Sequence, residues 1–61
     1  ARLEREEIQR RLQARGLSVG GIDGIIGNQS RAAIRAFQRA HRLPEDGHPS
    51  AELLELLRAG E

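Results

Sequence analysis

The chain has 61 residues, with ten arginines against nine acidic residues, a formal net charge of +1, one aromatic residue (Phe37) and no cysteine. This length allows one domain with a marginal core, and the absence of cysteine excludes disulfides and thiolate metal sites. The balanced charge argues against a nucleic-acid binder. No run approaches the roughly 18 apolar residues of a membrane span. No signal peptide is visible. The chain starts at once in charged, helix-like sequence, so we expect a domain excised from a longer protein.

The first predicted helix runs from about residue 4 to residue 15. Ile8 and Leu12 are spaced as on one buried helix face, and Leu3 is expected to pack over the start. Acidic residues near its beginning and arginines near its end complement the helix dipole. Gly16 suits the left-handed position that follows a helix, with Leu17 packing back onto it.

Residues 18–27, SVGGIDGIIG, form a glycine-rich loop that excludes a long helix. Val19 and Ile22 are expected to be buried beneath it. The loop leads directly into the next helix, so its conformation determines how that helix begins.

The second helix is predicted to start between residues 28 and 30 and to end near residue 41, with Asn28 or Ser30 as its cap. At about 100° per residue its two faces separate clearly. The inward face carries Ala33, Ile34, Phe37 and Ala40, and the opposite face carries Arg31, Arg35, Arg39 and Arg42.

Residues 44–50, PEDGHPS, form a second turn because Pro44 blocks further helix. The third helix is predicted to begin at Pro49 or Ser50. Its inward residues are Leu53, Leu54 and Leu57, and Leu56 is expected to be partly exposed.

The chain also repeats itself. Asp23-Gly24 precedes Ser30, and apolar residues follow that serine at the same offsets as those that follow Ser50 after Asp46-Gly47. Ile8-Gln9 is repeated as Phe37-Gln38. The sequence therefore predicts an all-α fold, a small three-helix bundle with a structured Asp-Gly loop between the first two helices.

Catalytic residues are hard to find. His41 and His48 are the only histidines, whereas a zinc site needs three or four ligands. Asp23 and Asp46 could be paired carboxylates of a glycosidase, but each precedes a glycine, as in a turn. We therefore expect a non-catalytic domain that holds no metal and no cofactor.

Three segments, IQRRLQARGL, DGIIGNQSRAAIRAFQRAHRLPEDG and PSAELLELL, resemble the type 1 peptidoglycan-binding domain over residues 5–57. The ending most resembles copies at the C-terminus of lytic murein transglycosylases. The resemblance implies one domain over residues 1–61 that binds bacterial peptidoglycan and anchors a covalently linked wall-cleaving domain. It also implies a location in the cell envelope, in the periplasm, and we expect a monomer. Relatives often carry an aromatic residue where Ile26 stands.

The glycine loop at the start of the second helix is the predicted contact site. Main-chain amides at a helix start suit a carboxylate, and stem peptides are rich in carboxylates and amides, although glycan contact stays open. Gly24 and Gly27 are expected to adopt conformations closed to other residues. Equally, Asp23 and the two glycines could serve only as turn scaffold, with Gln9 and Gln38 satisfying the loop backbone. The candidate ligand-binding residues are Asp23, Gly24, Ile25, Gly27, Asn28, Gln29 and Arg31.

An alternative hypothesis is a protein-interaction or nucleic-acid-binding module that uses the arginine face of the second helix. A basic row can follow phosphates, but a solvated face opposite a core face accounts for the same pattern. The loop before this helix is also longer than the 3–4-residue turn of a helix-turn-helix.

Overall fold

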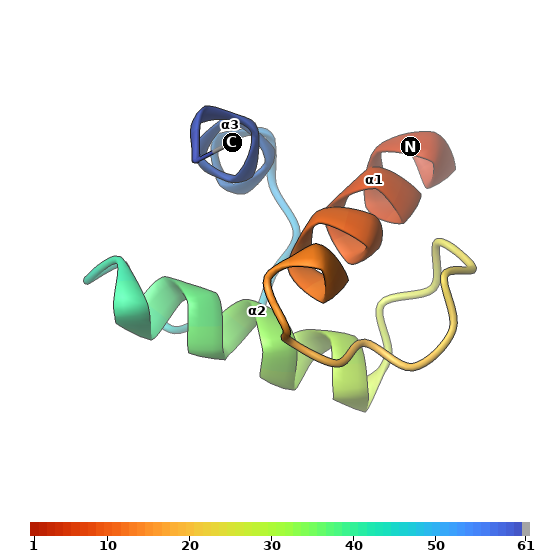
Figure 1. Cartoon of the computed structure of the whole chain (residues 1–61), viewed down its shortest axis with the longest axis horizontal. Coiled ribbons are helices and arrows are strands. Elements are labelled where there is room, and N and C mark those ends of the chain that lie inside the picture. The colour runs from red at the N-terminus through yellow and green to blue at the C-terminus, as the bar shows by residue number, and fades with distance from the viewer. Residues whose placement is uncertain (61) are drawn as a thin grey trace.

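The structure is a computed structural model that describes residues 1–60. It contains three helices, α1 (Arg2–Ala14), α2 (Asn28–Ala40) and α3 (Ala51–Ala59), and no strand in that span (Figure 1). The predicted all-α, three-helix fold is confirmed. Within the described residues, no helix is both long enough and apolar enough to span a bilayer.

Helices α1 and α3 lie over one side of α2, and the loop between α1 and α2 extends beyond the bundle (Figure 1). The core lies between the three helices, closed at one side by Val19 from the loop. Its buried members are Ile8, Leu12, Val19, Ala33, Ile34, Phe37, Leu53, Leu54 and Leu57. All of these were predicted to be buried, and three further residues that were predicted to pack on the core do not.

Leu3, Ile22 and Ala40 do not pack as predicted. Leu3 is 77% exposed, because α1 begins at Arg2 and the helical turn places Leu3 on the outer face. Ile22 is 39% exposed, at the outer part of the loop. Ala40 is exposed because it is the last residue of α2.

Helices α1 and α2 end in the same way. Gly16 has φ +85° and Arg42 has φ +58°. In each case the next residue's N–H bonds back into the helix: Leu17 to the Leu12 carbonyl (3.1 Å), and Leu43 to that of Gln38 (2.8 Å). Both leucines are half-buried against the core, as in a Schellman motif. The prediction for Gly16 and Leu17 is confirmed.

A second set of contacts fixes α1 against α3. The Glu7 carboxylate accepts two hydrogen bonds from Arg58 (2.7 Å each) and one from Arg11 (2.8 Å). The Arg58 and Arg11 hydrogen bonds lower the pKa of Glu7 to about 2. Arg15 donates to the Leu57 carbonyl (3.2 Å) and lies over the Phe37 ring. These contacts fix the relative positions of the helices that carry the loops.

Candidate ligand-binding site

Gln9 organises the first Asp-Gly turn, residues 23–25. Its side chain is fully buried in α1. Its Oε1 accepts hydrogen bonds from the backbone N–H groups of Gly24 (2.8 Å) and Asp23 (3.1 Å). Its Nε2 donates to the carbonyl of Ile25 (3.0 Å) and to the hydroxyl of Ser30 (3.1 Å). One helix side chain thus satisfies several loop groups, which confirms the predicted role of Gln9.

Asp23 is part of this scaffold as well. Its Oδ1 accepts the N–H of Ile25 (2.9 Å) and the amide of Gln9 (3.2 Å). The Ile25 N–H, followed by the Gln9 side chain, lowers the pKa of Asp23. The carboxylate is therefore ionised at neutral pH, with one oxygen occupied by the turn.

Gly24 is required by packing. It has φ +76°, and a Cβ there would lie 2.7 Å from Cγ of Arg2 and 3.2 Å from its carbonyl oxygen. Its own carbonyl accepts a hydrogen bond from Nε of Arg5 (2.6 Å). Since its N–H and C=O are both bonded and the residue is buried, Gly24 lies beneath the site rather than in it.

Helix α2 begins without a capping side chain. Its N-cap is Gly27, and neither Asn28 nor Ser30 takes that role, so the cap prediction is wrong. The Ser30 hydroxyl is buried, accepting from Gln9 and donating to the Val19 carbonyl (3.3 Å). The first amides of α2 therefore have no side-chain acceptor and lie at the positive end of the helix dipole.

A depression of about 240 Å³ lies at this helix start; we call it the first depression. Gly27 lines it with φ −92°, and Gly21 lines it without a positive φ. A Cβ at either position would meet no atom within 4 Å. The expectation that Gly27 needs a conformation closed to other residues is therefore wrong. Neither backbone conformation nor packing requires glycine at these two positions, and the missing side chains leave the depression open.

The structure brings most of the predicted residues together. The first depression is lined by Asp23, Ile25, Gly27, Asn28 and Gln29, and also by Val19, Gly20, Gly21 and Ser30. Ile25 is 68% exposed and Ile26 packs against the core. The pair Gly20-Gly21 was not among the predicted site residues, although adjacent glycines before the turn were a usable signal.

Arg31 does not line the first depression. Its guanidinium donates to the Ile26 carbonyl (3.1 Å) and to Oδ1 of Asn28, so it folds back along the loop. Gln29 is also engaged, donating to the hydroxyl of Ser18 (2.8 Å). Arg31 is half-buried, whereas Arg35 and Arg39 of α2 are exposed. Arg42, predicted on the same helix face, is exposed but lies beyond the end of α2.

The second Asp-Gly turn, residues 46–48, repeats the arrangement. Gln38 accepts the Gly47 N–H (3.0 Å) and donates to Oδ1 of Asp46 (2.8 Å), which also accepts the His48 N–H (3.0 Å). Those two bonds to Asp46, the His48 N–H first, lower its pKa. The predicted role of Gln38 is confirmed.

The true register of this repeat differs from the predicted one. Gly27 and Ser50 are the two N-caps, and each lies four residues after its aspartate. The predicted pairing of Ser30 with Ser50 is therefore wrong by three residues. Three residues are almost one helical turn, so both registers place apolar residues on the same face.

Comparison with known proteins identifies the domain. A family model described as "Putative peptidoglycan binding domain" matches residues 2–57. The chain therefore belongs to the peptidoglycan-binding domain family. The structure is also similar to that of SltB3 from Pseudomonas aeruginosa, solved in complex with NAG-anhNAM-pentapeptide and with NAG-NAM-pentapeptide. In both cases the TM-score is 0.90 and the identity 51%, over 93% of this chain and 15% of that chain.

Two curated relatives of this peptidoglycan-binding domain carry a different name, "Putative OxPP cycle protein OpcA". The protein from Nostoc punctiforme is 49% identical and the one from Synechococcus elongatus 42% identical, each over 90% of this chain. The chain spans 12% of each of these relatives. The domain is thus similar to small parts of much longer proteins with dissimilar names.

Proposed function

We propose that the chain binds peptidoglycan without cleaving it, through the first depression, and holds an attached wall-cleaving domain on its polymer. The observation that carries this proposal is the family match over nearly the whole chain. The 51% identity to a protein solved with two pentapeptide-bearing NAG-NAM ligands supports it. A location in the cell envelope, in the periplasm, follows from this proposal.

The geometry of the first depression suits a stem peptide. The uncapped amides of Asn28 and Gln29 face an approaching acceptor, and the helix dipole favours a carboxylate there. Gly21 and Gly27 let a ligand approach the backbone closely. Ile25, which is 68% exposed, offers an apolar surface beside these donors. Asp23 and Gly24 support this surface from below.

A site of this size binds weakly, and weak binding is sufficient for a tethered module. A linked domain raises the local concentration of its partner on the polymer by the effective-concentration effect. Fast release from each site then lets the enzyme move along a wall with dense repeated sites. We propose that the domain acts as a monomer in this way.

Co-sedimentation with purified sacculi tests the proposal. The unchanged chain should pellet with sacculi, and Gly27→Asp should bind at least about fivefold more weakly, because the new carboxylate caps the amides and repels a ligand carboxylate. Gln13→Glu adds the same charge at an exposed position of α1 and should bind like the unchanged chain. An unchanged chain that stays wholly in the supernatant would refute wall binding. Equal loss in both variants would refute this site.

A second candidate is a protein-interaction module, and the OpcA relatives favour it, since their printed name is unrelated to the wall. The exposed arginines of α2 would be its interface. Reversing the charge of Arg35 and Arg39 together separates the two candidate surfaces. Wall binding through the first depression predicts nearly unchanged sedimentation, whereas loss in this variant together with normal binding by Gly27→Asp would favour the arginine face.

A further inference from the structure

The second Asp-Gly turn has a depression of its own, of about 330 Å³; we call it the second depression. It is in the same place relative to its turn as the first. When the residues are numbered from the aspartate of each turn, both depressions are lined by positions −3, −2, 0, +4, +6 and +7. The internal repeat therefore reproduces the surface hollow together with the turn.

The lining has changed between the two copies. Gly20 and Gly21 of the first depression correspond, counted from the aspartate, to Leu43 and Pro44 of the second. At the helix start, Ser50 accepts the Leu53 N–H (3.0 Å), so the cap is closed. The position of the neutral Gln29 is occupied by the acidic Glu52. Leu56, 38% exposed, completes an apolar wall.

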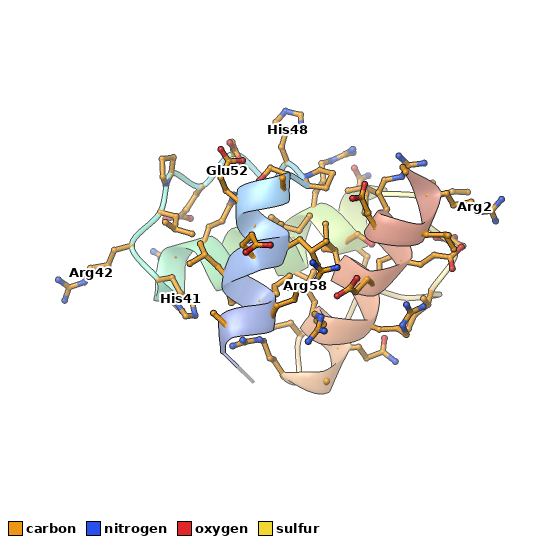
Figure 2. The ribbon with its side chains drawn as sticks, turned by 90° about the horizontal axis from the view of Figure 1, so that it is seen from above. Arg2, His41, Arg42, His48, Glu52 and Arg58 are labelled. Atoms are coloured by element: carbon orange, nitrogen blue, oxygen red, sulfur yellow. The ribbon has the colours of Figure 1, made fainter. Side chains whose placement is uncertain are left out.

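The charged residues that line the second depression are both acidic. Residues 43–57 contain four acidic residues and no arginine, whereas residues 1–42 contain nine arginines and four acidic residues. Two of these acids, Asp46 and Glu52, line the depression, and no basic side chain lines it. Figure 2 shows Glu52 at the start of α3, close to the turn that carries His48, while Arg42 points away from the bundle. The small overall charge of the chain hides this separation.

An apolar wall with an anionic rim is complementary to an alkyl chain that ends in an ammonium group. Methylene groups gain by covering Leu43, Pro44 and Leu56, and the ammonium gains by lying beside Asp46 and Glu52. A carboxylate is disfavoured here, because Ser50 occupies the helix-start amide and the neighbouring charges repel it. The second depression thus has the opposite charge preference from the first.

We propose that the second depression binds the side-chain ammonium of the diamino acid in peptidoglycan stem peptides. This inference rests on the proposed wall-binding function. In this proposal, the two copies of the repeat bind groups of opposite charge on the stem peptides. The first copy contacts carboxylate and carbonyl oxygens, and the second contacts the amine.

Amide chemical shifts of the 61-residue chain, followed in a titration with the peptide L-Ala-D-isoglutamine-L-Lys-D-Ala, test this inference. The peptide with a free lysine side-chain amine should shift amides of residues 43–56. Nε-acetylation of the lysine should abolish those shifts and leave the shifts at residues 20–30. Glu52→Gln should weaken the effect at residues 43–56 roughly threefold to fivefold. Glu55→Gln removes the same charge from α3 outside the depression and should change it little.

A simpler probe separates this inference from wall binding itself. Pentylamine should shift residues 43–56 at low salt, with a smaller effect at high salt, and pentanol should not. If sacculi bind and the stem peptide shifts residues 20–30, but acetylation changes nothing at residues 43–56, the second depression is not an amine site and the proposed function stands. If pentylamine shifts residues 43–56 but the chain binds neither the stem peptide nor sacculi, the wall is not the source of the amine and both proposals fail.

Discussion

The starts of α2 and α3 are two versions of one structure. Both follow an Asp-Gly turn tied to a buried or nearly buried glutamine, Gln9 or Gln38, and both begin four residues after the aspartate at an extended N-cap. At α3 the cap is Ser50, whose hydroxyl accepts a backbone amide, and at α2 it is Gly27, which has no side chain to accept one. The shared turn is scaffold, and the cap and lining are the parts that differ. In the proposed function, the ligand is held at the helix start that lacks a side-chain cap.

The largest effect should come from removing Gln9. Gln9→Ala leaves buried backbone N–H groups of the first turn without an acceptor and should lower the free energy of unfolding by about 2–4 kcal/mol. Gln38→Ala removes fewer bonds, because Gln38 accepts from one amide only, and should cost about 1–2 kcal/mol. Urea denaturation of both variants measures the difference. Equal losses would mean that the two turns are energetically equivalent, which contradicts the account.

Next in size is the contrast between Gly24 and Gly27. Gly24→Ala forces a side chain into a left-handed conformation against the Arg2 carbonyl and should cost about 1–3 kcal/mol. Gly27→Ala meets no neighbour and has a permitted φ, so only the poorer capping preference of alanine counts, and it should cost about 0.5–1 kcal/mol. Thermal denaturation monitored by circular dichroism compares them. A large loss at Gly27 would show that this glycine is structural after all.

Exchanging the caps should give smaller changes of opposite sign. Ser50→Ala removes the bond to the Leu53 amide and should cost about 1 kcal/mol. Gly27→Ser gives α2 the cap that α3 has and should add a few tenths of a kcal/mol in stability, by analogy with measured caps. The same Gly27→Ser variant should bind sacculi less well. A variant that gains stability without losing binding would separate the bare helix start from the function.

The smallest effect on stability is expected from acid. It concerns the Glu7 contacts between α1 and α3 and not the two Asp-Gly turns. The folded pKa of Glu7 is about 2, below its ordinary 4.5, so its contribution is fully present above about pH 4.5 and is lost as the pH falls toward 2. Glu7→Gln removes this dependence and should flatten the denaturation midpoint against pH below 4.5. An unchanged slope would assign the acid sensitivity to Asp23 and Asp46, whose pKa values are also lowered.

Much of the fold could be predicted from the sequence because helical spacing, glycine and proline carry direct structural meaning. Ile34, Phe37 and Leu57 are buried as their spacing indicates. Side-chain identity also indicated that Gln9 and Gln38 bond the loops. What the sequence left open were features that spacing does not resolve.

The cap register was one such feature, because a shift of three residues leaves every apolar face in place. The exposure of Ile22 was another, since a loop has no periodicity to indicate which side is inward. The role of Gly27 depended on a φ value, and glycine accepts both signs. The second depression is formed by packing between α2, its turn and α3, and no local motif marks it.

The most direct test of the central claim is a titration of the chain with NAG-NAM-pentapeptide, monitored by amide chemical shifts. The account predicts that the amides of Asn28, Gln29 and Ser30 move and that Gly27→Asp greatly reduces the movement. If those three amides stay still while another surface of the domain responds, the uncapped start of α2 is not where this domain holds its ligand.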